Sequence, residues 1–155
     1  MSYQLSEWNR YDYKQLNKIK AIKRTTKQGT ELYNNAVMML DTETSKKDPD
    51  TIGQNHIVAF TLSIRYQHEN ICTLYGHRPT ELIKCLDLVM RSMNGDHTII
   101  YVHNLSYDWV FIRKYLFEIY GHPIKQLNTK SHYPIRIELQ NGLILRDSLI
   151  LSQKS

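Results

Sequence analysis

The sequence predicts an α/β domain, a mixed sheet flanked by helices, and three observations carry this prediction. The length of 155 residues suits a single hydrophobic core. The composition, with 41% hydrophobic and 23% charged residues, is that of an ordinary folded protein. Segments rich in β-branched and aromatic residues alternate along the chain with segments of helical periodicity, and this alternation indicates helices packed on a sheet.

The first half of the chain predicts three strands. Residues 36–44 form a short apolar run that ends in polar residues, as a buried strand does where it emerges at a sheet edge. Residues 45–55 contain proline and glycine and predict a loop. Residues 56–66 and 70–76 are rich in β-branched and aromatic residues and are separated by only three residues, so we expect an antiparallel hairpin.

The second half predicts two helices among further strands. Residues 79–93 place apolar side chains at helical spacing, with Thr80 as the expected N-cap. A strand over 97–104 leads to a largely apolar helix over 106–121, for which Ser106 is the expected cap. Three strand candidates follow, the last two joined by an Asn-Gly turn: residues 124–130, 134–140 and 143–151.

The beginning of the chain is basic. Residues 1–35 hold seven basic and three acidic residues, so they carry +4 of the chain's net charge of +5. Apolar residues at three-residue steps predict an amphipathic helix over 11–27, closed by Gly29. We therefore expect a basic helical extension, residues 1–35, before a domain over 36–155. The charge suits either a phosphate backbone or a solvated helix face.

Several classes of protein find no support in the sequence. Cys72 and Cys85 have no C-x-x-C spacing, and the histidines form no pair at zinc-binding spacing. The first residues lack the apolar stretch of a signal peptide, and no apolar run approaches the roughly 18 residues of a membrane span. We expect a cytoplasmic protein without a membrane partner; the oligomeric state is not predicted.

Two carboxylates stand at the end of the first strand. Asp41 and Glu43 are two residues apart, so both side chains leave the strand on the same face. Two like charges at that distance favour a neutralising cation, and oxygen ligands without sulfur or imidazole favour Mg²⁺ or Mn²⁺. The alternative is a solvated surface pair.

Further polar residues follow the next strands. Asp108 lies in the first turn of the second helix, and the carboxyl ends of neighbouring strands converge on one crevice, so it can meet the first two carboxylates. The alternative is stabilisation by the helix dipole. Asn104 can bind a ligand or cap the helix, and Tyr107 can stack on a base or belong to the core. We expect Asp147 to be satisfied by backbone amides.

Three segments together resemble a known family. DTET at 41–44, YVHNLSYDWVFI at 101–112 and LRDSLIL at 145–151 resemble, in order and spacing, the amino-terminal 3′ to 5′ exonuclease domain of family B DNA polymerases. The likeness is greatest to the protein-primed polymerases of phages and linear plasmids, and it covers roughly residues 36–151. It implies a ribonuclease-H-like exonuclease fold.

The resemblance also implies an activity and its residues. Asp41, Glu43 and Asp108 would be catalytic carboxylates that hold two Mg²⁺ or Mn²⁺ ions and hydrolyse 3′-terminal nucleotides from single-stranded DNA. The positions that match those holding the 3′ end are Thr44, Asn104, Tyr107, Ser148 and Leu149. The positions near that strand, or near a priming protein, are Tyr101, His103 and Phe111.

The likeness is incomplete. The family's third exonuclease motif, Y-x-x-x-D, does not occur after Asp108, nor do the polymerase motifs, so we expect a domain truncated at its carboxyl end, with weak metal binding and low or no nuclease activity. A nuclease-dead module that binds nucleic acid or protein as a regulator is the alternative. A rival catalytic pattern, His-x(4)-Asp, matches His103 and Asp108 by count, but its middle aspartate would fall in a loop or within a helix.

Overall fold

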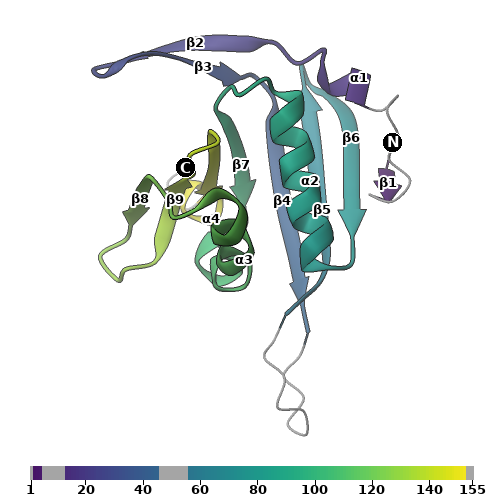
Figure 1. Cartoon of the computed structure of the whole chain (residues 1–155), viewed down its shortest axis with the longest axis vertical. Helices are drawn as coiled ribbons and strands as arrows, with labels where there is room; N and C mark the ends of the chain where they lie inside the picture. Colours follow the sequence, from purple (N-terminus) through teal and green to yellow (C-terminus); the bar gives the residue numbers. More distant parts are fainter. Residues whose placement is uncertain (1, 5–12, 46–55, 153–155) are drawn as a thin grey trace, which may run out of the picture.

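The computed structural model describes residues 2–4, 13–45 and 56–152, and these form one eight-stranded sheet, a separate two-stranded ribbon and two long helices (Figure 1). In these ranges, no helix has the length and apolar character needed to cross a membrane. The sheet contains, in spatial order, β1 (Ser2–Gln4), β6 (Glu69–Gly76), β5 (Ile57–Tyr66), β4 (Val37–Thr44), β7 (Thr98–Val102), β10 (Leu143–Asp147), β9 (Pro134–Glu138) and β8 (Lys125–Asn128).

The sheet is mixed, and its parallel strands end at one edge. β4 pairs antiparallel with β5 and parallel with β7, and β7 pairs parallel with β10. In this register Leu40 lies beside Val102, and Val102 lies beside Asp147. The carboxyl ends of β4, β7 and β10 therefore meet, as expected for parallel strands.

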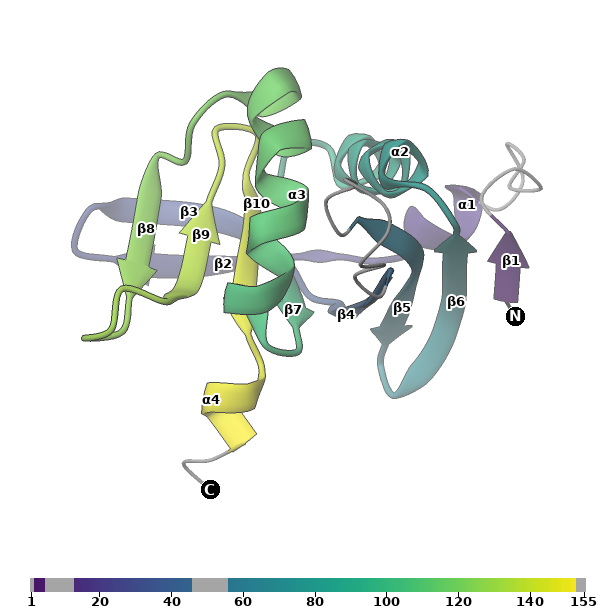
Figure 2. The ribbon, with the colours of Figure 1, turned by 90° about the horizontal axis from the view of Figure 1, so that it is seen from below.

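One face of the sheet carries the helices. Along β4, Met38 and Leu40 are buried while Val37 and Met39 are about half exposed, so the helices cover only the first pair's face. Helix α2 (Pro79–Ser92) contacts β5 and β6, helix α3 (Leu105–Tyr120) contacts β9 and β10, and the two helices touch each other (Figure 2). The core lies between this sheet face and the helices.

The predicted strands and both predicted long helices are confirmed, with different caps. Helix α2 begins after Arg78 with Pro79 in its first turn, where the fixed φ of proline suits a helix, so Thr80 is not the cap. Helix α3 begins after Asn104, which has a φ of 58°. Asparagine tolerates this left-handed conformation, and Ser106 instead donates its hydroxyl hydrogen to Asn104 Oδ1 at 3.0 Å.

The last predicted strand is too long. Strand β10 ends at Asp147, and the short helix α4 (Leu149–Ser152) follows. The apolar residues after Asp147 continue the composition of the strand, but Asp147 Oδ1 accepts a hydrogen bond from the backbone N–H of Ile150 at 3.1 Å. This contact turns the chain into a helical conformation at that point.

The predicted helix over 11–27 is wrong. Helix α1 covers only Tyr13–Leu16, and β2 (Ala21–Thr26) then pairs antiparallel with β3 (Gly29–Asn34). Gly29 does not end a helix; its φ of +133° closes this hairpin, and glycine reaches such a conformation without strain.

The basic N-terminal segment contacts the rest of the fold. Strand β1 pairs parallel with β6, and the Leu16 side chain is fully buried in the core. The backbone N–H of His97 donates to the carbonyl of Leu32 at 2.9 Å, which joins β3 to the start of β7. The domain boundary at residue 35 stays a prediction.

Candidate functional site

The polar residues of strand β4 lie alternately on the two faces of the sheet. Asp41 and Glu43 are exposed on the face that the helices leave uncovered, as their spacing predicts. Thr42 and Thr44 alternate with them and point to the helix face. A register shift between Glu43 and Thr44 interrupts the pairing with β5 at this end of the strand.

Thr42 joins β4 to helix α3. Its hydroxyl donates a hydrogen bond to Asp108 Oδ1 at 2.5 Å, and only 3% of Asp108 is exposed. Asp108 lies in the first turn of α3, where its backbone N–H points to the carbonyl oxygen of Asn104 at 3.4 Å. The carboxyl group of residue 108 therefore lies at the carboxyl end of β4.

Burial raises the pKa of Asp108 from its ordinary value of 3.8 to about 6. The Thr42 hydroxyl opposes this rise by stabilising the charged form, and the carboxylate of Asp41 adds to it by repulsion. His103 lowers the pKa slightly and Asp147 raises it. Asp41 and Asp108 thus interact electrostatically, although they leave different elements.

Asp147 fixes the start of helix α3. Its Oδ2 accepts a hydrogen bond from the backbone N–H of Leu105 at 2.9 Å, one of the donors at a helix start that have no partner within the helix. With the Ile150 contact, both carboxylate oxygens accept backbone N–H groups, and the expectation that Asp147 is satisfied by amides is confirmed. The backbone N–H of Ser148 donates to the carbonyl of Val102 at 3.0 Å and ties β10 to β7.

Tyr107 presents an aromatic surface beside the carboxylates. Its hydroxyl lies 2.7 Å from Thr44 Oγ1, and its ring is 5.1 Å from the ring of Phe111 in an edge-to-face arrangement. Since 46% of Tyr107 is exposed, its ring is available to a ligand and is not a core aromatic. An exposed ring held at its hydroxyl end can stack on a nucleobase.

The remaining predicted residues lie at different distances and on different faces around Tyr107 and the carboxylates. His103 and Asn104 are exposed in the turn between β7 and α3. Tyr101 is half-buried and pairs with Met39, which places it on the sheet face of Asp41, away from Tyr107. Leu149 is half-buried in the first turn of α4, just beyond the end of β10.

The three carboxylates have the donor atoms that a hard divalent cation prefers, but they do not surround a common point. Asp41, Glu43 and Asp108 offer carboxylate oxygens only, the ligands that Mg²⁺ and Mn²⁺ prefer. Within residues 2–4, 13–45 and 56–152, no group of three or more His, Cys, Asp or Glu side chains is placed to hold a metal ion. Asp108, bonded to Thr42, lies on the helix face of β4, whereas Asp41 and Glu43 leave the strand on the other face. The structure therefore does not gather the three carboxylates into one group, and a shared site stays a prediction.

Sequence reasoning missed Thr42. The period of two that places Asp41 and Glu43 on one face places Thr42 and Thr44 on the other, and this signal was present in the sequence. Which partners the threonines meet depends on where helix α3 lies, and that comes only from the folded chain.

The fold of this chain, a mixed sheet with two long helices on one face, is similar to that of part of a DNA polymerase. Two solved structures of phi29 DNA polymerase match it, one bound to primer-template DNA with incoming nucleotide and one to primer-template DNA after translocation. The TM-scores are 0.54 and 0.53, and the sequence identities are 18% and 17%.

Each match covers 74% of this chain and 21% of the polymerase, so the chain spans about a fifth of the length of these structures. At such identities the likeness is one of fold. No protein-family model matches the sequence, and no curated protein matches it.

Proposed function

We propose that this chain is a 3′ to 5′ exonuclease domain of the ribonuclease-H-like fold, of the kind found in protein-primed family B DNA polymerases, and that it holds the 3′ end of single-stranded DNA. The observation that carries the proposal is the hydrogen bond from Thr42 to Asp108, because it holds the third carboxylate at the carboxyl end of β4, where the charge of Asp41 acts on it. Asp41 and Glu43 leave that end of the strand on its other face. The likeness of fold to a DNA polymerase supports it.

The DNA end would bind at the start of helix α3. Tyr107 would stack on a base, and the amide of Asn104 with the hydroxyls of Thr44 and Ser148 would hydrogen-bond the terminal nucleotides. Leu149, just beyond β10, would also contact the 3′ end. The residues expected near this strand, or near a priming protein, are Tyr101, His103 and Phe111; of these, Tyr101 lies on the other sheet face from Tyr107 and suits the priming protein better.

Asp41, Glu43 and Asp108 would hold the Mg²⁺ or Mn²⁺. When bound, such ions supply the charge that activates water and stabilises the leaving 3′ oxygen in phosphodiester hydrolysis. In this chain, the Thr42 hydroxyl orients the Asp108 carboxylate, and Asp147 fixes the helix that carries it.

The experiment measures binding and cleavage of a 5′-fluorescein-labelled single-stranded 20-mer with and without Mn²⁺. We expect binding that strengthens with Mn²⁺ and 3′ trimming that is slow or absent. Asp41→Asn and Asp108→Asn should remove the effect of Mn²⁺, whereas Glu118→Gln, which removes an exposed carboxylate from the same helix, should retain it. Binding that ignores both Mn²⁺ and Asp41→Asn would contradict the proposed metal site.

A second candidate is a binding module without nuclease chemistry. The observation that favours it is that the described carboxylates do not close into a group of three ligands. Such a module would bind the single strand equally well with Mn²⁺ or with a chelator, and would lose affinity on Tyr107→Ala. Fast Mg²⁺-dependent digestion by the purified chain would exclude this candidate.

A further inference from the structure

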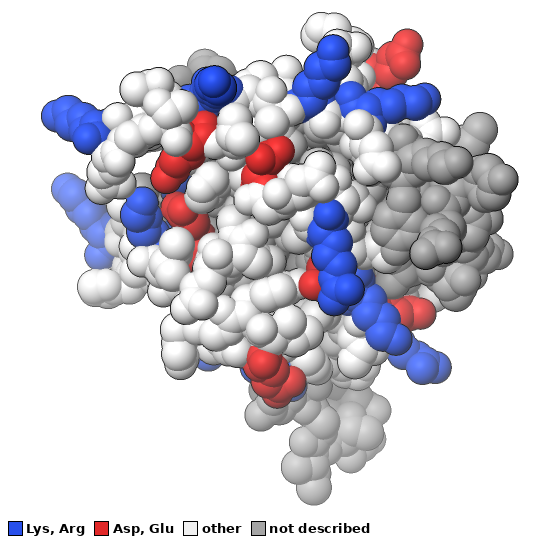
Figure 3. All heavy atoms as spheres, turned by 45° about the horizontal axis from the view of Figure 1, so that its top comes forward, with Lys and Arg blue, Asp and Glu red and all other residues white. Residues whose placement is uncertain are grey.

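The hairpin of β2 and β3 carries positive charge that the carboxylate site does not use. Five basic side chains lie between residues 18 and 27, and all are exposed. Glu31 is the one acidic residue between positions 18 and 34. Lys and Arg side chains project at the left edge of Figure 3, where Figure 1 places the tip of this hairpin. The basic side chains are Lys18, Lys20, Lys23, Arg24 and Lys27.

The acidic residue of the hairpin is turned toward the fold. Glu31 Oε2 accepts a hydrogen bond from the hydroxyl of Tyr33 at 3.1 Å, and Glu31 Oε1 lies 4.0 Å from His97 Nε2. Arg24 lies over the ring of Tyr33, 4.6 Å from its centroid. Lys23 and Lys27, by contrast, form no ion pair with any residue that the structure describes, so their charges face solvent.

The base of the hairpin is fixed to the main sheet. The backbone N–H of Asn34 donates to the carbonyl of His97 at 3.0 Å, and its side-chain amide donates to Thr98 Oγ1 at 2.5 Å. The rings of Tyr33 and His97 stack with their centroids 4.9 Å apart. The hairpin is therefore a ribbon fixed at its base, which extends away from the end of β4 (Figure 1). At its turn, Gln28 Oε1 accepts a hydrogen bond from Lys125 Nζ of β8 at 3.5 Å.

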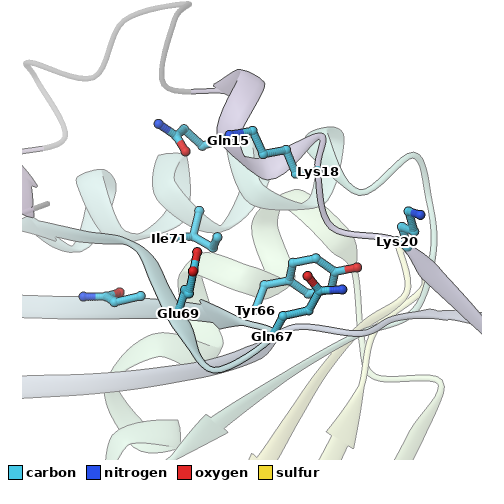
Figure 4. A pocket seen from close by; sticks show the side chains of 8 residues that line it. Gln15, Lys18, Lys20, Tyr66, Gln67, Glu69 and Ile71 are labelled. Atoms are coloured by element: carbon cyan, nitrogen blue, oxygen red, sulfur yellow. The ribbon is translucent and has the colours of Figure 1, made fainter.

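Two hollows lie at the base of this ribbon and share Gln67. One, of about 320 Å³, has Lys18 and Gln15 on one side and Tyr66, Gln67 and Glu69 on the other (Figure 4). The other, of about 430 Å³, is lined by Arg65, His68, Asn35 and Val37 as well as Gln67. Basic and amide side chains thus continue from the ribbon onto the end of the sheet.

We propose that the β2–β3 ribbon is a binding surface for double-stranded DNA. Lys23 in β2 and Lys27 in the turn, which form no ion pair with a described residue, match the phosphate backbone, where each contact releases a counterion. The major groove admits a two-stranded ribbon. The Thr26 hydroxyl already donates to the carbonyl of Gly29 at 3.2 Å and those of Thr25 and Thr30 lie 3.3 Å apart, so the lysines carry the contact with the phosphates. The surface lies at the amino end of β4, where Val37 pairs with Arg65, and it does not depend on the proposed nuclease function.

The test measures the affinity for a fluorescein-labelled 20-base-pair blunt duplex by anisotropy, from 50 to 300 mM NaCl, in Mg²⁺-free buffer. For Lys23→Glu/Lys27→Glu, we expect weaker binding and a slope of log K against log salt that is less steep by about two, since each lysine contact contributes about one. Lys23→Gln/Lys27→Gln should lower the slope equally without adding repulsion, and circular dichroism checks that both variants are folded.

A matched control makes the same change in net charge at another place on the molecule. Lys84→Glu/Lys114→Glu alters two exposed lysines on α2 and α3 and should leave the slope unchanged; an equal loss in both pairs would mean that only total charge matters and would overturn the proposal. A single strand of the same length that binds as tightly, and loses as much with the hairpin variants, would also overturn it. Asp108→Asn should leave duplex binding unchanged, which separates this surface from the carboxylate site.

Discussion

Asp108 is the residue at which the opposing forces of the candidate site are clearest. Its place in the first turn of α3 favours the charged form through the helix dipole, and the Thr42 hydroxyl favours it too. Burial and the carboxylates of Asp41 and Asp147 favour the neutral form, and together they prevail, because the pKa is raised to about 6. A group held in this balance responds strongly to a nearby cation.

The raised pKa predicts that Asp108→Asn stabilises the chain at high pH. Between pH 4 and pH 6 the folded chain binds more protons at this residue than the unfolded chain, so the free energy of unfolding of the wild type falls as pH rises through this range. The asparagine cannot ionise. At pH 8 we expect the variant to have the higher melting temperature and a free energy of unfolding that exceeds the wild type's by at most about 3 kcal/mol. Both differences should vanish below pH 4.

Thermal unfolding by circular dichroism at pH 4 and pH 8, in a chelating buffer, measures this difference. Glu118→Gln is the control on the same helix and should show no such pH-dependent gain. An Asp108→Asn variant that is equally stabilised, or equally destabilised, at both pH values would contradict the pKa argument.

At the residue scale, the sequence was enough to predict which residues of β4 share a sheet face. It was not enough to predict which side chains they contact. The period of two in a strand was enough to place Asp41 and Glu43 together. The bond between Thr42 and Asp108 joins residues 66 positions apart and depends on where α3 packs, which no local pattern contains.

At the scale of elements, the start of helix α3 depends on Asp147. Replacing it by alanine leaves the buried N–H of Leu105 and the half-buried N–H of Ile150 without their acceptor, so we expect the free energy of unfolding to fall by about 1–3 kcal/mol. Asp147→Asn keeps one acceptor and should lose less. Urea denaturation measures both, and equal losses in the two variants would show that these hydrogen bonds are not the cause.

Gly76 at the end of β6 is needed because of a close approach. A Cβ atom there would lie 2.6 Å from the ring of Phe60, a fully buried side chain, and 3.2 Å from the Cβ of Glu81. Gly76→Ala should therefore destabilise the chain by about 1–3 kcal/mol. In a Phe60→Leu background the ring is absent, so Gly76→Ala should lower the free energy of unfolding by less. If the loss is the same in both backgrounds of this double-mutant cycle, the ring of Phe60 is not the group that clashes.

The predicted helix over 11–27 shows the limit of periodicity. Leu16, Ile19 and Ile22 are three residues apart, which suits a helix, but in the structure Ile22 pairs with Tyr33 across the hairpin. A pattern of three apolar residues cannot distinguish the two structures. The strand that pairs with Ile22, β3, begins only at Gly29, beyond the three apolar residues.

At the scale of the whole molecule, the two proposed surfaces lie at opposite ends of β4. The basic ribbon and its hollows adjoin Val37, and the carboxylates adjoin Thr44. Eight residues of strand separate these ends by roughly 25 Å, so a duplex on the ribbon and a strand end at the carboxylates would be held at different places on one rigid sheet.

The fold class and the sequence of elements could be predicted, but the order of the strands could not. β10 lies between β7 and β9, and β1 adds to the far edge beside β6. These neighbours are joined by long-range pairing, for which the sequence of a single strand carries little information. The convergence of β4 and β7 was predictable only through the general rule for parallel strands.

The most direct test of the central claim, that Asp41, Glu43 and Asp108 serve one site for divalent cations, is paramagnetic broadening by substoichiometric Mn²⁺ in the ¹H–¹⁵N spectrum of the labelled chain. The account predicts that the amide signals of residues 41–44 and of 104–108 broaden together, and that Asp41→Asn abolishes the broadening of both groups. Broadening of only one group, or of neither while other carboxylates respond, would contradict it.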